Sequence, residues 1–166
     1  MKVTWDEFVA THASTVLTAA LRVVANSADA DEVSQEVFLE IYRAGDFALL
    51  HTQGALVRTM ATRRALDRLR RLKPVVQLTD TEPARDGFEP YQYLIANELD
   101  GQLRSSLSQL PPREAEVFCL VYYEGHSPAA VAHLLGISTG AVSKALCKAR
   151  ERLAVTFGCS ESESYR

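Results

Sequence analysis

The sequence of 166 residues lacks long apolar stretches, paired cysteines and an excess of positive charge. Its longest apolar run, residues 117–123, falls far short of the roughly 20 residues that a membrane-spanning helix needs. Residues 1–7 carry acids where a signal peptide would carry its apolar stretch. We therefore expect a cytoplasmic protein without membrane insertion.

The three cysteines, Cys119, Cys147 and Cys159, are odd in number and widely spaced, which excludes a disulfide framework and a Cys-x-x-Cys metal pair. We expect free thiols. The sequence also lacks a phosphate-cradling glycine loop, a nucleophile elbow and a histidine cluster. These absences predict a chain that is not an enzyme and has no metal, cofactor or small-molecule substrate.

The net charge of -3 hides an uneven distribution. Residues 1–54 hold 3 basic and 8 acidic side chains, whereas residues 55–73 hold 7 basic and 1 acidic. Residues 74–98 are again acidic, and residues 99–166 are balanced. A weakly acidic chain with one dense basic segment is suited to a specific anionic contact at one place and a different partner elsewhere.

The prolines stand where helical patterns start or stop, and no stretch alternates apolar and polar residues as a strand does. The pattern predicts an all-α protein with two small helical domains at residues 1–73 and 99–157. A flexible acidic linker at 74–98 would join them, and a polar tail would follow at 158–166.

The first domain is expected to contain three helices. The first opens with a capping box at Thr4 and Glu7, and His12 falls on its apolar face, where a buried side chain is expected. The second runs from Asp29 to about Arg43. Its predicted buried stripe consists of Ala30, Val33, Val37 and Ile41.

The opposite face of this second helix presents Glu32, Gln35 and Glu36 around Leu39, which lies about 200° from Val37 and should be exposed. Two interpretations remain open at this point. The face is either a docking surface for a basic partner or an ordinary solvated acidic surface.

The third helix, residues 55–73, carries the basic segment. Leu56, Met60, Leu66 and Leu69 are its candidates for burial, and Asp67 is its one local counter-ion. Seven cations against one acid favour contact with phosphates over a balanced solvated stripe. These cations are Arg58, Arg63, Arg64, Arg68, Arg70, Arg71 and Lys73.

Residues 128–147 have the pattern of a helix-turn-helix, with Ala132, Gly136 and Val142 as its scaffold. A small residue is needed where the helices cross, and a positive φ is needed in the turn. Ser127 and Ser138 are placed to cap the two helices. The second helix would present Thr139, Ser143, Lys144 and Lys148 to a DNA groove, as a recognition helix does. The alternative is a plain helical hairpin.

The order of these parts resembles the extracytoplasmic-function (ECF, group 4) sigma factors of bacterial RNA polymerase over nearly the whole chain. Residues 29–39 look like the core-binding helix of that family. Residues 56–71 look like the segment that melts and reads the minus-ten promoter element, and residues 110–153 look like the module that reads the minus-thirty-five element.

The resemblance implies roles for particular residues. It implies that the clamp helices of the largest polymerase subunits are contacted by Asp31, Glu32, Gln35, Glu36 and Leu39. It implies that promoter DNA is contacted by Arg58, Arg63, Arg64, Arg68, Arg70, Arg71, Thr139, Ser143, Lys144 and Lys148. The loop 45–54 is a candidate for capture of an unpaired base, with Phe47 as its stacking surface.

Several positions depart from the usual family pattern, in the basic helix and in residues 130–132 and 140–145 of the helix-turn-helix. Leu56 stands where the family has tryptophan, Arg63 where it has asparagine, and Ala145 where it has an arginine that would meet DNA.

The function implied is that of a promoter-specificity subunit whose partners are core RNA polymerase, promoter DNA and an anti-sigma factor. One alternative is a stand-alone helix-turn-helix DNA-binding regulator. Another is a sigma-like protein-interaction module without initiation activity.

Overall fold

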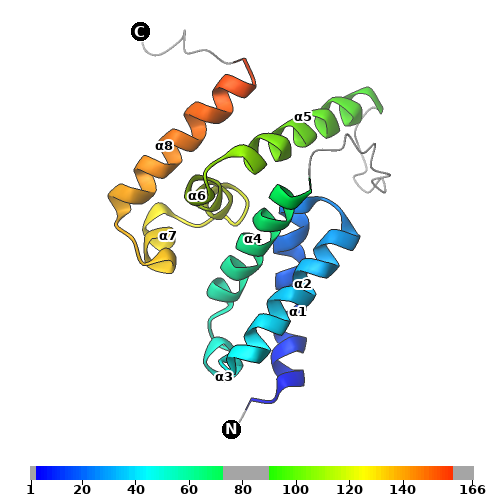
Figure 1. Cartoon of the computed structure of the whole chain (residues 1–166), viewed down its shortest axis with the longest axis vertical. Coiled ribbons are helices and arrows are strands. Elements are labelled where there is room, and N and C mark those ends of the chain that lie inside the picture. Colours follow the sequence, from blue (N-terminus) through cyan, green and yellow to red (C-terminus); the bar gives the residue numbers. More distant parts are fainter. Residues whose placement is uncertain (1–2, 73–89, 159–166) are drawn as a thin grey trace.

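The structure, a computed structural model, describes residues 3–72 and 90–158, and the side chains of these residues except 90–99. The described residues form eight helices and no strand, in agreement with the all-α prediction (Figure 1). The helices are α1 (Trp5–Val24), α2 (Ser27–Ala44), α3 (Phe47–Leu50), α4 (Gly54–Arg71), α5 (Pro90–Gln109), α6 (Pro112–Tyr122), α7 (Pro128–Leu135) and α8 (Thr139–Thr156).

Local sequence signals set the helix ends in the first module, which comprises α1 to α4. The capping box predicted at Thr4 and Glu7 is present, with each side chain accepting a hydrogen bond from the backbone of the other residue. The helix α2 begins at Ser27, two residues before the predicted start, because the side chain of Asn26 accepts from the backbone N–H of Asp29.

The core of the first module lies between α1, α2 and α4. The stripe predicted on α2 is confirmed, since Ala30, Val33, Val37 and Ile41 are all buried. The prediction for α4 is only partly correct: Leu66 is buried, whereas Leu56, Met60 and Leu69 are half-buried. Smaller residues make up most of the buried face of α4, and they let its backbone approach α1 closely. These are Val57, Thr59, Ala61, Thr62 and Ala65.

The second module comprises α5 to α8. Its own apolar core includes Val117, Leu120, Val131, Val142 and Leu146. Because α5 begins at Pro90, residues 90–98 of the predicted linker belong to a helix. Proline suits the first position of a helix, where its missing N–H would have no partner anyway. The rest of the predicted linker, up to residue 89, and the tail from residue 159 lie outside the described residues.

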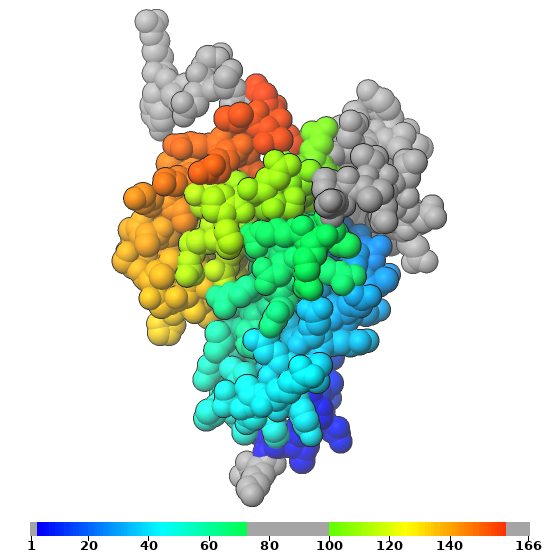
Figure 2. Space-filling view, viewed as in Figure 1, coloured from blue at the N-terminus to red at the C-terminus, as the bar shows by residue number. Residues whose placement is uncertain are grey.

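The two modules pack against each other along α4. The core of the first module continues into the second through Leu107, Leu110, Ala115, Cys119 and Leu153. In the space-filling view the green surface of α4 adjoins the yellow-green surface of the second module (Figure 2). Most of the contact between the modules is therefore made by the helix that carries the basic segment, and Arg22 of α1 adds an ion pair with Glu124.

The structure also bears on the predictions made for the cysteines and for membrane insertion. Cys119 is buried and Cys147 is exposed, and neither forms a disulfide within the described residues. Within residues 3–72 and 90–158, no single helix is long and apolar enough to cross a membrane. Only α7 and α8 taken together reach that length and composition, and they are bent by 110° relative to each other.

Candidate functional site

The outer face of α2 borders an apolar groove of about 680 Å³. Leu39 is 46% exposed there and Tyr42 is 58% exposed, so two large apolar side chains lie side by side at the surface. The groove is lined by Trp5, Val9, Asp31, Ser34, Gln35, Phe38, Leu39 and Tyr42. Three of the five predicted polymerase-binding residues, Asp31, Gln35 and Leu39, thus belong to a single groove.

The other two predicted residues of that surface, Glu32 and Glu36, form ion pairs with α4. Glu32 pairs with Arg68, and Glu36 lies 3.6 Å from Nη2 of Arg71. The sequence prediction missed the aromatic part of the groove. Tyr42 lies one helical turn after Leu39 and was within reach of the same spacing argument. Trp5 comes from α1, and periodicity along α2 carries no information about it.

The arginines of α4 that face α2 are held by its carboxylates. Arg64 donates to Oε2 of Glu40 from Nε at 2.9 Å and from Nη2 at 2.7 Å. Arg68 donates to Oδ1 of Asp29 in the same two-nitrogen manner. These hydrogen bonds raise the pKa of both arginines above its ordinary value. Both side chains are therefore fixed cations in a defined orientation.

Asp67, expected as the one local counter-ion, pairs with Arg70 at 3.3 Å. The remaining counter-ions come from elements that helical spacing along α4 cannot reveal. With these partners counted, each of the six arginines predicted to contact DNA pairs with a carboxylate of the protein. The pairs are Arg58–Glu124, Arg63–Glu116, Arg64–Glu40, Arg68–Asp29, Arg70–Asp67 and Arg71–Glu36.

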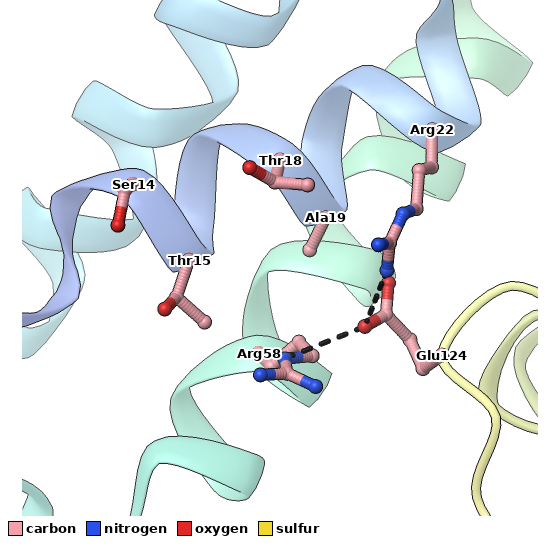
Figure 3. A pocket seen from close by; sticks show the side chains of 7 residues that line it. All are labelled: Ser14, Thr15, Thr18, Ala19, Arg22, Arg58 and Glu124. Atoms are coloured by element: carbon pink, nitrogen blue, oxygen red, sulfur yellow. Dashed lines mark hydrogen bonds and ion pairs between the residues drawn. The ribbon is translucent and has the colours of Figure 1, made fainter.

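Two of these pairs join the modules. Glu124, in the turn after α6, lies 3.2 Å from Nη1 of Arg22 on α1 and 3.4 Å from Nε of Arg58 on α4. Figure 3 shows its carboxylate between the two guanidinium groups, beside a small pocket. Glu116 on α6 lies 2.7 Å from Nη2 of Arg63.

The helix-turn-helix prediction is confirmed by the geometry of α7 and α8. Gly136 has a φ of +63°, and the backbone N–H of Ile137 closes the turn by donating to Ala132 at 3.0 Å. Ala132 and Val142 are buried at the crossing. The hydroxyls of Ser127 and Ser138 cap α7 and α8 as predicted.

The second helix of this motif exposes the four predicted DNA-contacting side chains, Thr139, Ser143, Lys144 and Lys148. Ala145 is only 8% exposed and belongs to the core of the second module. The predicted DNA-contacting side chains thus lie on an exposed face of α8. Ala145, at the position where the family usually has arginine, lies on the buried face.

Phe47 of the loop 45–54 packs inside the first module. Its ring centroid lies 5.5 Å from that of Trp5 and 6.2 Å from that of Phe8. Leu49 is the large side chain that this loop exposes, at 69%. Phe47 is half-buried and packs against Trp5 and Phe8, and its role as a stacking surface for a base stays a prediction.

His12 is buried, as its position on the apolar face predicted, and its Nε2 lies 3.0 Å from the backbone oxygen of His51.

Across residues 3–72 and 90–158, no three histidine, cysteine or acidic side chains come together in a way that could hold a metal ion. The arrangement as a whole offers an apolar groove, an arginine-rich helix and a helix-turn-helix.

In a comparison with known proteins, each of the two modules matches a family model. Residues 8–74 match the family model for sigma-70 region 2, and residues 100–153 match that for sigma-70, region 4. The fold resembles that of CnrH in its complex with the cytosolic domain of CnrY, with a TM-score of 0.50 and 21% identity. This likeness covers 95% of this chain and 89% of CnrH.

Similar proteins include the ECF RNA polymerase sigma factor SigE of Mycolicibacterium smegmatis, 30% identical over 90% of this chain and 60% of that protein. SigM of Mycobacterium tuberculosis is 31% identical over 80% of this chain and 66% of that protein. The chain thus spans less than two thirds of the length of these two relatives. SigW of Bacillus subtilis is 24% identical over 80% of this chain and 77% of that protein. With both regions matched in order, the chain belongs to the sigma-70 family and to its extracytoplasmic-function (ECF) group.

Proposed function

We propose that this chain binds core RNA polymerase and directs promoter-specific initiation of transcription. The single observation that carries the proposal is the exposed apolar groove around Leu39, on the same chain as a helix-turn-helix. A stand-alone DNA-binding regulator has no use for such a groove. The chain needs no reaction of its own, since the polymerase performs the chemistry, and it would act in the cytoplasm, where polymerase and promoter are found.

The polymerase-binding surface is proposed to consist of Asp31, Glu32, Gln35, Glu36 and Leu39. Leu39 would insert as an apolar anchor, and burying it together with Tyr42 removes apolar surface from water. The surrounding acids favour a basic partner surface and speed its approach. Trp5 and Phe38 also line the groove, and the partner would pack against them.

Two elements are proposed to contact promoter DNA. Thr139, Ser143, Lys144 and Lys148 on α8 would face the groove of the minus-thirty-five element. The arginines of α4 would face the minus-ten region, where each carboxylate partner must be exchanged for a phosphate. Such an exchange makes binding steeply dependent on salt concentration.

An anti-sigma protein is proposed as a further partner. CnrH, which shares this fold, is described in complex with the cytosolic domain of CnrY. In this chain the apolar groove offers a surface that such a protein could cover.

The proposal is tested by capture of purified bacterial core polymerase on the immobilised full-length chain. The wild-type chain should retain the polymerase, whereas Leu39→Asp and Glu36→Lys should lose it. Leu21→Asp is the matched control, because Leu21 is 42% exposed on α1, outside the groove. It should retain the polymerase.

Two outcomes contradict the proposal. If the wild-type chain captures no polymerase but binds duplex DNA tightly by itself, the stand-alone regulator is the better interpretation. If the chain captures polymerase, yet the reconstituted enzyme starts transcription on no genomic DNA, the chain is an interaction module without initiation activity.

A further inference from the structure

A small polar pocket lies where α1, α4 and the turn after α6 meet (Figure 3). Its volume is about 220 Å³, far more than a single water molecule requires. One face of α1 forms one wall, and Arg58 of α4 lies opposite. Among the residues that line it, Ala19 alone is apolar. The pocket is therefore built for a polar occupant, unlike the groove around Leu39.

Three hydroxyl groups of α1 line this pocket, those of Ser14, Thr15 and Thr18. A hydroxyl inside a helix often donates to the carbonyl one turn earlier. Thr11 on the same helix does so, with its hydroxyl 2.8 Å from the backbone oxygen of Glu7. The three pocket hydroxyls make no hydrogen bond within the described part of the chain. They are therefore available as donors to a molecule in the pocket.

Arg58 supplies donors from the opposite side. Its Nε lies 3.4 Å from Oε2 of Glu124, and its two terminal nitrogens make no hydrogen bond to any residue in 3–72 or 90–158. The side chain is 36% exposed, so a small solute can reach it. The guanidinium group thus keeps N–H donors for an occupant of the pocket.

Glu124 fixes the position of this arginine. Its side chain is only 1% exposed and lies between the guanidinium groups of Arg22 and Arg58 (Figure 3). Two guanidinium groups and one carboxylate leave a formal charge of +1 at the pocket. A positive charge of this kind repels metal cations and attracts anions.

The positions of the donors distinguish between classes of anion. Hydroxyls on α1 and the guanidinium group on α4 lie on two sides of the pocket, so the occupant needs acceptor oxygens that point in more than one direction. A tetrahedral phosphate has such oxygens, whereas both oxygens of a carboxylate point to one side. Arginine, serine and threonine side chains are also common ligands of phosphate oxygens.

We propose that this pocket binds a phosphate group, either as free phosphate or as part of a small phosphate ester. Arg58 is its charged ligand, and hydroxyls of α1 donate to it from the other side. Glu124 acts as a positioning residue for Arg58. The site goes beyond the proposed function, since neither polymerase nor promoter takes part in it.

The test is a titration of the full-length, ¹⁵N-labelled chain at constant ionic strength, followed by NMR of the backbone amides. The probes are inorganic phosphate and glycerol 3-phosphate, with glycerol as the uncharged control. At least one of the two anions should give saturable shifts that cluster at residues 14–22 and around Arg58 and Glu124. Glycerol should give none. The more tightly bound anion shows whether the pocket takes free phosphate or an ester.

Two matched pairs of variants test the ligands. Thr18→Val should weaken binding of the anion about tenfold, as expected for the loss of one hydrogen bond to a charged group. Thr11→Val makes the same change on the same helix outside the pocket and should bind as wild type does. Arg58→Gln should abolish saturable binding, whereas Arg43→Gln, at an exposed arginine of α2, should retain it.

Several results would overturn the proposal. Equal affinities in the two valine variants, or in the two glutamine variants, would show that anions associate with the arginines of the chain in general. Equal shifts with glycerol would show that the pocket does not select charge. If neither anion gives saturable shifts but a DNA duplex shifts the same amides, the pocket belongs to a DNA-binding surface and is no site for a small phosphate.

Discussion

Arg68 joins the C-terminal turn of α4 to the N-terminal turn of α2 through Asp29. Its Nε and Nη2 lie 3.0 Å and 2.7 Å from Oδ1 of the carboxylate. An acid near a helix N-terminus and a cation near a helix C-terminus are each favoured by the helix dipole. One ion pair therefore neutralises two helix ends and fixes the angle between the helix proposed to bind polymerase and the helix proposed to bind DNA.

Arg68→Lys should lower the free energy of unfolding by about 1 kcal/mol, because an ammonium group cannot donate two bonds to one carboxylate in a fixed plane. Both partners are only about one-fifth exposed, so water replaces the lost bond poorly. Thermal unfolding followed by circular dichroism measures the change. Arg43→Lys, at an exposed arginine of α2, is the control, and an equal melting temperature for the two variants would refute the assigned role.

The thiols of Cys119 and Cys147 should differ sharply in reactivity. Burial, aided by the nearby charge of Glu124, raises the pKa of Cys119 to about 12, so almost no thiolate is present at pH 8. Cys147 is exposed on α8. In a Cys159→Ser background, titration with a chromogenic disulfide should detect one fast thiol, and Cys147→Ser should abolish that reaction. A fast reaction that survives the second substitution would contradict the burial of Cys119.

Ionisation of Cys119 and Tyr123 should make the protein less stable at alkaline pH. Burial raises the pKa of both Cys119 and Tyr123 above their ordinary values of 9.0 and 10.0. A raised pKa in the folded state adds stability that is complete below the unfolded-state pKa and is lost as pH rises through the folded-state pKa. For Cys119 this window runs from pH 9 to about 12.

Urea unfolding at pH 8 and pH 10.5 measures this loss, which is limited to about 1.4 kcal/mol per pH unit for each group. Cys119→Ala should reduce the loss, because of the two groups with a raised pKa it leaves Tyr123 alone. A stability of the wild-type chain that is constant across this range would show that neither group is as buried as the structure has it.

The sequence predicted those parts of the structure that depend on neighbours along the chain. The stripe from Ala30 to Ile41 follows helical periodicity, and the caps at Thr4 and Ser138 depend on residues three positions away. Gly136 could be assigned because a turn of this kind requires a positive φ. In each case the physical cause acts within one or two helical turns.

The parts that the sequence did not predict depend on contacts between distant segments. Asp67 was the only counter-ion visible near the arginines, yet five of the six pair with acids from α2, α6 or the turn after α6. The contact of Phe47 with Trp5 is likewise not visible in the sequence pattern, because Trp5 lies 42 positions earlier in the chain. Charge counts and periodicity along one helix contain no information about which other helix faces it.

Gly136 and Gly140 offer a matched pair for testing the geometry of the helix-turn-helix. Gly136 has a φ of +63°, which alanine adopts only with strain, whereas Gly140 lies in the first turn of α8 with ordinary helical geometry. Gly136→Ala should therefore destabilise the protein by about 1 kcal/mol. A methyl group at Gly140 would meet only Oγ of Ser138, at an ordinary contact distance of 3.9 Å.

Gly140→Ala should stabilise the protein by up to about 1 kcal/mol, because alanine loses less backbone entropy than glycine when a helix forms. The two substitutions add the same methyl group four residues apart, so the opposite signs arise from backbone conformation alone. Urea unfolding of both full-length variants gives the comparison. A shift of the same sign and size in both would mean that the turn between α7 and α8 does not require the left-handed conformation at Gly136, and the placement of Lys144 and Lys148 for DNA would lose its structural basis.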